Sequence, residues 1–351
     1  MHTRRSLLKA TAGVGLGAAC RVATPGVIPA RKRRIGMLST GTALDPYDPA
    51  GPFAAFRDGM RAEGFIEGAE YSVDYRFGNG EPDQVLRGAK DLVGLGVEII
   101  VAGTTGATQA ALAVTSFVPI VMVASHDPID AGVVRDLVRP GGNVTGQSLS
   151  GAQLWPGQLE LLKQLAPVRR LGYLSPYFPP IVRGYPRVVI TSVTAMFERS
   201  FRAAAAVAGL EVVAPPIAST SDVGSVLATL EAERVDAVHL IESPTWFAQQ
   251  TRSPINEVVD FAARRRIPSM SGLRHYAEVG LLATYGDARS GVDLYRSVTR
   301  YVAKILRGAR PGDLSVEVPP VFELSLNAKT ASMIGLDLPK HVVDRAAVVF
   351  R

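Results

Sequence analysis

The chain has 351 residues, of which 47% are hydrophobic and 20% are charged. It is too apolar for a disordered chain and too long for one ordinary core, so we expect two globular lobes. The formal net charge of +6 would suggest a nucleic-acid partner, but residues 1–34 hold eight basic side chains and no acidic one. The remainder has 30 basic against 32 acidic residues, which excludes a bulk charge for binding nucleic acid.

Residues 1–30 have the anatomy of an export signal. The pair Arg4-Arg5 precedes a short apolar stretch of small residues, 10–19, which is too short to span a bilayer as a lasting helix. The arginine pair favours twin-arginine export, with the Sec pathway as the alternative. Cys20 is either the lipid-modified first residue of a lipoprotein or is removed by cleavage after Ala30, which the sequence favours. We therefore expect a periplasmic protein.

Short apolar runs then alternate with helical patterns, which indicates βαβ repetition. The runs are nearly all apolar, as in a parallel sheet with helices on both faces. The first series of expected strands is 35–38, 71–75, 97–101 and 120–124, with helices at 53–63, 84–94 and 105–116. After a glycine-rich turn at 139–146 and a helix at 153–165, the second series of strands is 171–174, 211–214, 236–241, 267–270 and 281–284, with helices at 196–208, 223–233 and 256–265.

These two series predict an α/β fold with two doubly wound parallel-sheet lobes, a hinge and a ligand cleft between the lobes. A helix at 293–306, a strand-like run at 322–327 and a short helix to residue 334 come last, and we expect them to return to the first lobe. The expected division is 33–147 with about 285–335 for lobe 1, 148–284 for lobe 2, and 336–351 as a C-terminal tail.

Ligands of such sheets lie beyond the carboxyl ends of the strands, where loops and helix N-termini offer free N–H groups. Thr104 and Thr105 open a helix and suit an anionic group, while Asp127 suits an ammonium or hydroxyl. The alternative is that the hydroxyls only cap helices and the aromatic residues only pack. The candidate ligand-binding residues are Ser39, Thr40, Gly103, Thr104, Thr105, Ser125, Asp127, Gln147, Tyr177, Glu242, Trp246 and Tyr285.

No motif indicates catalysis. Residues 146–150, GQSLS, lack the final glycine of a nucleophile elbow. His126-Asp127 has no metal-ligand partners at suitable spacing, and no dinucleotide fingerprint follows a strand. We therefore predict no catalytic residue, no metal and no cofactor.

Several motifs together resemble the ABC transporter substrate-binding protein family, which is related to tryptophan- and phenylalanine-binding members. They are IGMLS at 35–39, FRDGM at 56–60, GFIEG at 64–68, DP at 127–128, RPGGNVTG at 139–146 and FELSLNAKTA at 322–331. The resemblance implies a type I periplasmic binding fold without catalysis. It also implies a monomer that captures a small molecule, such as an amino acid or aromatic compound, and delivers it to an ABC permease in the inner membrane. The segment 175–194 departs from the family pattern, which leaves the ligand open.

Three other functions are considered for this fold, and only the first fits the sequence equally well. A periplasmic ligand sensor of the same fold would act on a signalling partner instead of a permease, and only neighbouring genes would separate the two. A periplasmic enzyme is disfavoured because no nucleophile–base pair is present. A transcription regulator is excluded, since no helix-turn-helix precedes the first strand.

Overall fold

The computed structural model describes residues 32–43, 47–149, 151–175, 193–217, 220–247, 253–319 and 321–351. Its first sheet has the order β2-β1-β3-β4-β5, and all pairs are parallel. These strands are β1 (Arg33–Ser39), β2 (Tyr71–Phe77), β3 (Ile99–Ala102), β4 (Ile120–His126) and β5 (Val144–Leu149). The predicted export signal lies outside the described residues. The described part contains no helix of the length and hydrophobicity that a membrane span requires.

Helices α1 (Pro52–Ala62), α2 (Pro82–Gly94) and α3 (Thr105–Val114) alternate with these strands. Proline stands in the first turn of α1 and of α2, where its missing N–H costs no helical hydrogen bond. Ile35 of β1 packs in one core cluster with Phe53 of α1, whereas Leu38 packs in another with Val85 of α2. The sheet therefore buries both faces, as its apolar strands predict.

The second sheet has the order β12-β11-β10-β9-β8-β6-β7, and only β10 and β11 pair antiparallel. Its strands are β6 (Arg170–Leu174), β7 (Glu211–Val213), β8 (Ala237–Leu240), β9 (Ser269–Ser271), β10 (Ala283–Asp287), β11 (Phe322–Asn327) and β12 (Val348–Phe350). Its helices are α4 (Trp155–Leu165), α5 (Val193–Val207), α6 (Val223–Ala232), α7 (Pro254–Arg265), α8 (Arg274–Glu278), α11 (Ala328–Ile334) and α12 (Lys340–Val343), with single turns η1 (Thr220–Asp222) and η2 (Pro244–Phe247). We call the two sheets with their helices the first and second lobes.

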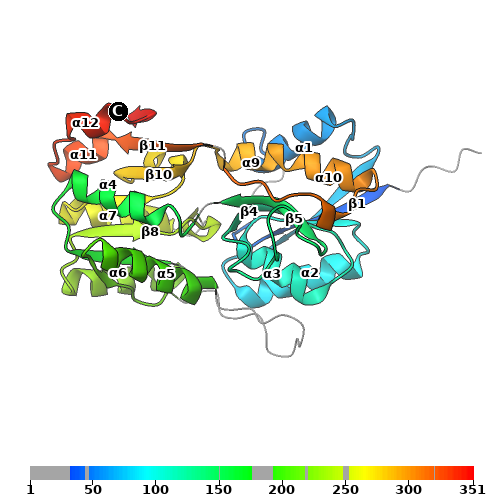
Figure 1. Cartoon of the computed structure of the whole chain (residues 1–351), viewed down its shortest axis with the longest axis horizontal. Coiled ribbons are helices and arrows are strands. Elements are labelled where there is room, and N and C mark those ends of the chain that lie inside the picture. Colours follow the sequence, from blue (N-terminus) through cyan, green and yellow to red (C-terminus); the bar gives the residue numbers. More distant parts are fainter. Residues whose placement is uncertain are drawn as a thin grey trace, which may run out of the picture. The chain divides into compact units, whose positions relative to one another are not determined.

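The C-terminal part differs from the expected division. Helices α9 (Gly291–Ser297) and α10 (Thr299–Leu306) pack on α1 of the first lobe (Figure 1). The chain then leaves through the turn η3 (Pro311–Asp313), and β11 and β12 extend the second sheet. The second lobe thus contains 322–334, which we expected in lobe 1, and also the presumed tail. Three segments, after β5, after β10 and before β11, connect the lobes.

The glycine-rich run 139–146 holds the third connecting segment on the first lobe. The N–H of Gly141 donates to the carbonyl of Gly312 at 3.1 Å, and the Thr145 hydroxyl donates to the carbonyl of Leu314 at 2.7 Å. Gly146 has φ 127°, and a Cβ there would overlap the backbone of Met122 on β4. The motif is thus explained by backbone packing, because only glycine fits this approach of β5 to β4.

Candidate functional site

A cavity of about 530 Å³ lies where strands of both sheets end. On the first lobe it is reached by residues that follow β1 and β3, by the end of β4, and by the start of α3. On the second lobe it is reached by residues after β6, β8 and β9. This is the position that ligands take in open α/β sheets, and its volume is that of a small-molecule site.

The first lobe presents hydroxyls and a helix N-terminus to this cavity. Thr104 caps α3 by accepting a hydrogen bond from the N–H of Ala107 at 3.2 Å, and its own hydroxyl donates to Thr40 at 3.3 Å. The N–H groups of Thr105 and Gly106 lie in the first helical turn, which has no intrahelical acceptors. Both residues line the cavity, so this turn can receive an anionic group.

An ion pair closes another part of the cavity wall and joins the two lobes. His126 ends β4 and Glu242 follows β8, and the distance from His126 Nε2 to Glu242 Oε2 is 3.1 Å. The two side chains are only 9% and 12% exposed. Gly272 lies against the other carboxylate oxygen, and a Cβ at this glycine would overlap it. The pair is therefore fixed in place by the surrounding backbone.

The electrostatics of this pair favour the charged forms. Burial alone would lower the pKa of His126, but the hydrogen bond and charge of Glu242, together with the charge of Asp127, raise it above its ordinary value. Burial would likewise raise the pKa of Glu242, but the hydrogen bond and charge of His126 lower it. By contrast, burial lowers the pKa of His275, which also lines the cavity, to about 4, so its imidazole is neutral at neutral pH.

Most of the remaining wall is apolar and rich in aromatic rings. Phe197 packs edge-on against the His126 ring at 5.5 Å between centroids, and Phe247 contacts both His275 and Tyr276 at 5.0 and 5.2 Å. No Lys or Arg of the described residues lines the cavity. The arrangement suits a small molecule with an apolar or aromatic body and few charged groups. Within the described part, no cluster of three or more His, Cys, Asp or Glu could hold a metal.

Six of the predicted site residues line this cavity, and their contact with a ligand stays a prediction. They are Ser39, Thr40, Gly103, Thr104, Thr105 and Glu242. Two others lie just behind the wall. Ser125 is fully buried and its hydroxyl points to that of Thr105 at 3.4 Å, while Asp127 accepts a hydrogen bond from the N–H of Ala152 at 2.9 Å. Asp127 thus braces the segment after β5, and it does not line the cavity.

The aromatic candidates of the second lobe have other surroundings. Trp246 is 1% exposed, and its indole N–H donates to the carbonyl of Ile241 at 2.7 Å inside the core. Tyr285 packs against the second-lobe core, and its carbonyl accepts from the amide of Gln158 at 2.7 Å. Tyr177 lies outside the described residues. The structure thus places Trp246 and Tyr285 in the core-packing environment that the alternative describes, and neither residue lines the cavity.

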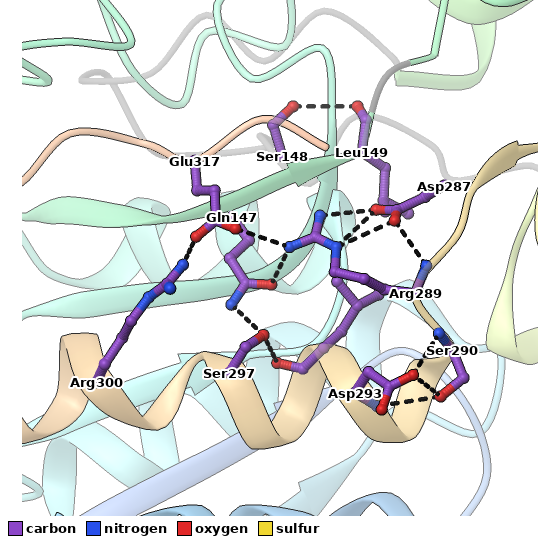
Figure 2. A network of polar contacts seen from close by, with 11 residues as sticks. Gln147, Ser148, Leu149, Asp287, Arg289, Ser290, Asp293, Ser297, Arg300 and Glu317 are labelled. Atoms are coloured by element: carbon purple, nitrogen blue, oxygen red, sulfur yellow. Dashed lines mark hydrogen bonds and ion pairs between the residues drawn. The ribbon is translucent and has the colours of Figure 1, made fainter. Parts of the chain in front are cut away.

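Gln147 belongs to a polar network that joins the three connecting segments. Its amide donates to the Ser297 hydroxyl at 2.7 Å and accepts from Arg289 at 3.2 Å (Figure 2). The same guanidinium binds Asp287 at 2.7 Å and Glu317 at 3.2 Å, and Glu317 also contacts Arg300. Gln147 is fully buried by these contacts, which explains its polar character without a ligand.

Sequence reasoning missed several residues of the wall. Phe197, Phe247, His275, Tyr276 and Tyr295 all line the cavity. Tyr295 comes from α9, which follows the second connecting segment. Its hydroxyl oxygen packs against Gly103, and a Cβ at this glycine would lie only 2.7 Å from that oxygen. His126 was considered only as a catalytic or metal-binding residue. Its proximity to Glu242 could have been predicted only by placing the ends of β4 and β8 together.

Comparison with known proteins shows consistent similarity. A family model described as "ABC transporter substrate binding protein" matches residues 53–350. A tyrosine-binding protein of Clostridioides difficile is 26% identical over 295 residues, covering 82% of this chain and 77% of that protein. Among solved structures, a conserved domain protein of Vibrio cholerae has a TM-score of 0.75 at 26% identity, covering 91% of this chain and all of the other. An ABC domain of Streptococcus pneumoniae in complex with L-Trp has a TM-score of 0.73 at 27% identity, with the same coverage.

Proposed function

Because the chain belongs to the ABC transporter substrate-binding protein family, we propose that it is the periplasmic solute-binding component of an ABC importer. Its ligand is an aromatic amino acid, captured between the two lobes and passed unchanged to a permease in the inner membrane. The twin-arginine-like leader supports export, and the similarity to tyrosine- and L-Trp-binding proteins supports the ligand class.

The observation that carries the proposal is the combination of a helix N-terminus with aromatic walls in one cavity. The ligand carboxylate meets the N–H groups of Thr105 and Gly106, since no basic side chain of the described part reaches the cavity except His126 and His275. The ligand ammonium meets Glu242, which replaces Asp127 in the role we expected from the sequence. The aromatic side chain packs among the rings of the wall.

Isothermal titration calorimetry tests this proposal. Residues 32–351 are titrated with L-Trp, L-Tyr and L-Phe, and with L-Ala as a ligand that lacks the ring. We expect binding of at least one aromatic amino acid, recovery of that amino acid unchanged, and far weaker binding of L-Ala. A folded protein that binds none of the three aromatic amino acids contradicts the proposed ligand class.

The variant Glu242→Gln identifies the ammonium contact. Loss of a hydrogen bond to a charged group should weaken binding by about 10- to 100-fold. The matched control is Glu323→Gln, since Glu323 is another mostly buried glutamate of the second lobe, paired with Arg274, that does not line the cavity. Equal affinities for the two variants would remove Glu242 from the binding site.

A further inference from the structure

His126 and Glu242 meet across the two lobes. One belongs to the five-stranded sheet and the other follows a strand of the seven-stranded sheet, yet their side chains are within hydrogen-bonding distance at 3.1 Å. Both line the cavity. This contact requires the two lobes to be close together and is broken when they move apart. It therefore differs between the two arrangements of the lobes.

We propose that His126 is a positioning residue, which holds Glu242 toward the bound ligand and makes ligand capture take up a proton. The inference rests on the proposed function, because it assigns a regulator to the same binding site. His126 itself need not touch the ligand. It acts through the carboxylate of Glu242, whose remaining lone pairs stay available to an ammonium group.

The local structure holds the imidazole in place for this role. The backbone N–H of His126 donates to the Thr105 hydroxyl at 2.9 Å, which ties the end of β4 to the first turn of α3. The Phe197 ring packs against the imidazole with an interplanar angle of 73°. His126 therefore links the turn that faces the ligand carboxylate to the side chain that faces the ligand ammonium. Binding of the carboxylate at α3 and binding of the ammonium at Glu242 are thereby coupled.

In the arrangement that the structure shows, the other titratable groups near the pair do not change charge in the same pH range. Burial lowers the pKa of His239 to about 4, as it does for His275, and the charge of Glu242 only partly offsets this. Burial raises the pKa of Tyr173 and Tyr276 far above neutral pH. Apart from Glu242, the charged group that acts on His126 is Asp127, which is adjacent in the chain and present whether or not the lobes meet.

The sign of the proton linkage follows from these pKa directions. With the lobes apart, His126 lacks Glu242 and keeps a pKa nearer to the ordinary value of about 6.5. With the lobes together, Glu242 raises that pKa, so we expect the protein to hold more protons when the lobes close on a ligand than when they are apart. Affinity is therefore highest below the free-state pKa and falls as the pH rises through the raised pKa, with a limiting slope of about tenfold per pH unit.

Calorimetry in buffers of different ionisation enthalpy measures this proton directly. The wild-type protein is titrated at pH 7.5 with the aromatic amino acid that binds it, once in phosphate and once in Tris. The difference in observed enthalpy should show net proton uptake on binding. At pH 5.5, in acetate and in MES, the uptake should be smaller, because this pH lies below the ordinary histidine pKa of about 6.5 and the free form already holds most of the proton. The ligand's own ammonium and carboxylate do not titrate between these pH values.

Two variants locate the proton. His126→Gln keeps a hydrogen-bond donor for Glu242 and should remove the uptake together with the pH dependence. The control His341→Gln, at an exposed histidine of α12 that does not line the cavity, should leave both unchanged. Binding without proton uptake in the wild-type protein would overturn the inference and leave the proposed function standing. Uptake that survives in His126→Gln would assign the proton to another group and also overturn it. Absence of any binding at either pH would instead contradict the proposed function.

Discussion

Replacing Asp287 by alanine tests whether the polar network of the connecting segments stabilises the fold. The Asp287 carboxylate is 3% exposed and accepts hydrogen bonds from the backbone N–H and the guanidinium of Arg289, at 2.7 to 3.1 Å. Removing one partner of a buried ion pair costs about 3–5 kcal/mol, because the other charge is left buried. Glu317 remains 3.2 Å from the same guanidinium, so we expect the lower limit, about 3 kcal/mol.

Thermal unfolding measures this loss. Lys32–Arg351 spans 320 residues, so an unfolding entropy of about 2.1 cal/mol/K per residue converts 3 kcal/mol into a drop in Tm of about 4–5 °C. The control is Asp313→Ala, since the Arg310–Asp313 pair is 85% and 70% exposed and should cost less than about 1 kcal/mol. Adding Arg289→Met to Asp287→Ala should restore part of the Tm. Equal Tm values for the two alanine variants would refute the reasoning.

Three further substitutions separate folding from binding. Gly146→Ala should destabilise the protein by more than about 2 kcal/mol, because the residue has φ 127° and its new Cβ would overlap the Met122 backbone. The control Gly142→Ala should leave Tm nearly unchanged, because a Cβ at Gly142 would meet open space. Thr104→Ala should lose about 1 kcal/mol of stability by removing the α3 cap and should weaken ligand binding, and Thr104→Ser should restore both. Trp246→Phe should lower Tm, because the Ile241 carbonyl loses its hydrogen-bond donor, and calorimetry should show an unchanged ligand affinity. A loss of affinity at constant Tm would instead show that Trp246 contributes to ligand binding.

The sequence predicted strands and helices well where the apolar residues of an element recur at the spacing that places them in the core. The expected strand 35–38 and the observed β1 differ only at the ends, because its apolar side chains alternate between two core clusters. The expected helix 53–63 likewise matches α1. In a parallel sheet with helices on both faces, local pattern and tertiary burial agree, so the fold class follows from the pattern.

The assignment of residues 322–334 to a lobe could not follow from the pattern. An apolar strand such as β11 satisfies either sheet, and the choice depends on which edge is free. Here β11 pairs antiparallel with β10, which periodicity does not reveal. The long helical pattern at 293–306 did return to the first lobe, but it is divided at Val298 into α9 and α10.

The sequence predicted cavity-lining residues correctly where their position at a strand end is enough to place them there. It failed where a hydrogen-bonding partner from elsewhere in the chain occupies the side chain. Thr104 and Thr105 line the cavity because the residues after β3 must lie at its carboxyl end. Asp127 and Gln147 also lie near strand ends, but Ala152 and Ser297 occupy their hydrogen-bonding groups. A polar residue at a strand end is thus a site candidate only until its partner is known.

The network around Arg289 and the pair His126–Glu242 are both buried, but they should respond differently when the two lobes separate. The network around Arg289 joins Asp287, at the end of β10 in the second sheet, to Gln147 of β5 and to Glu317 in the segment before β11. Asp287 and Arg289 are only two residues apart in the chain, so their contact can persist when the lobes separate and should contribute to stability. The contact between His126 and Glu242 joins different sheets and cannot persist. Asp287→Ala should therefore lower Tm while leaving proton uptake on binding intact, whereas His126→Gln should remove the proton uptake. The two variants separate a structural network from a binding-linked contact in the same molecule.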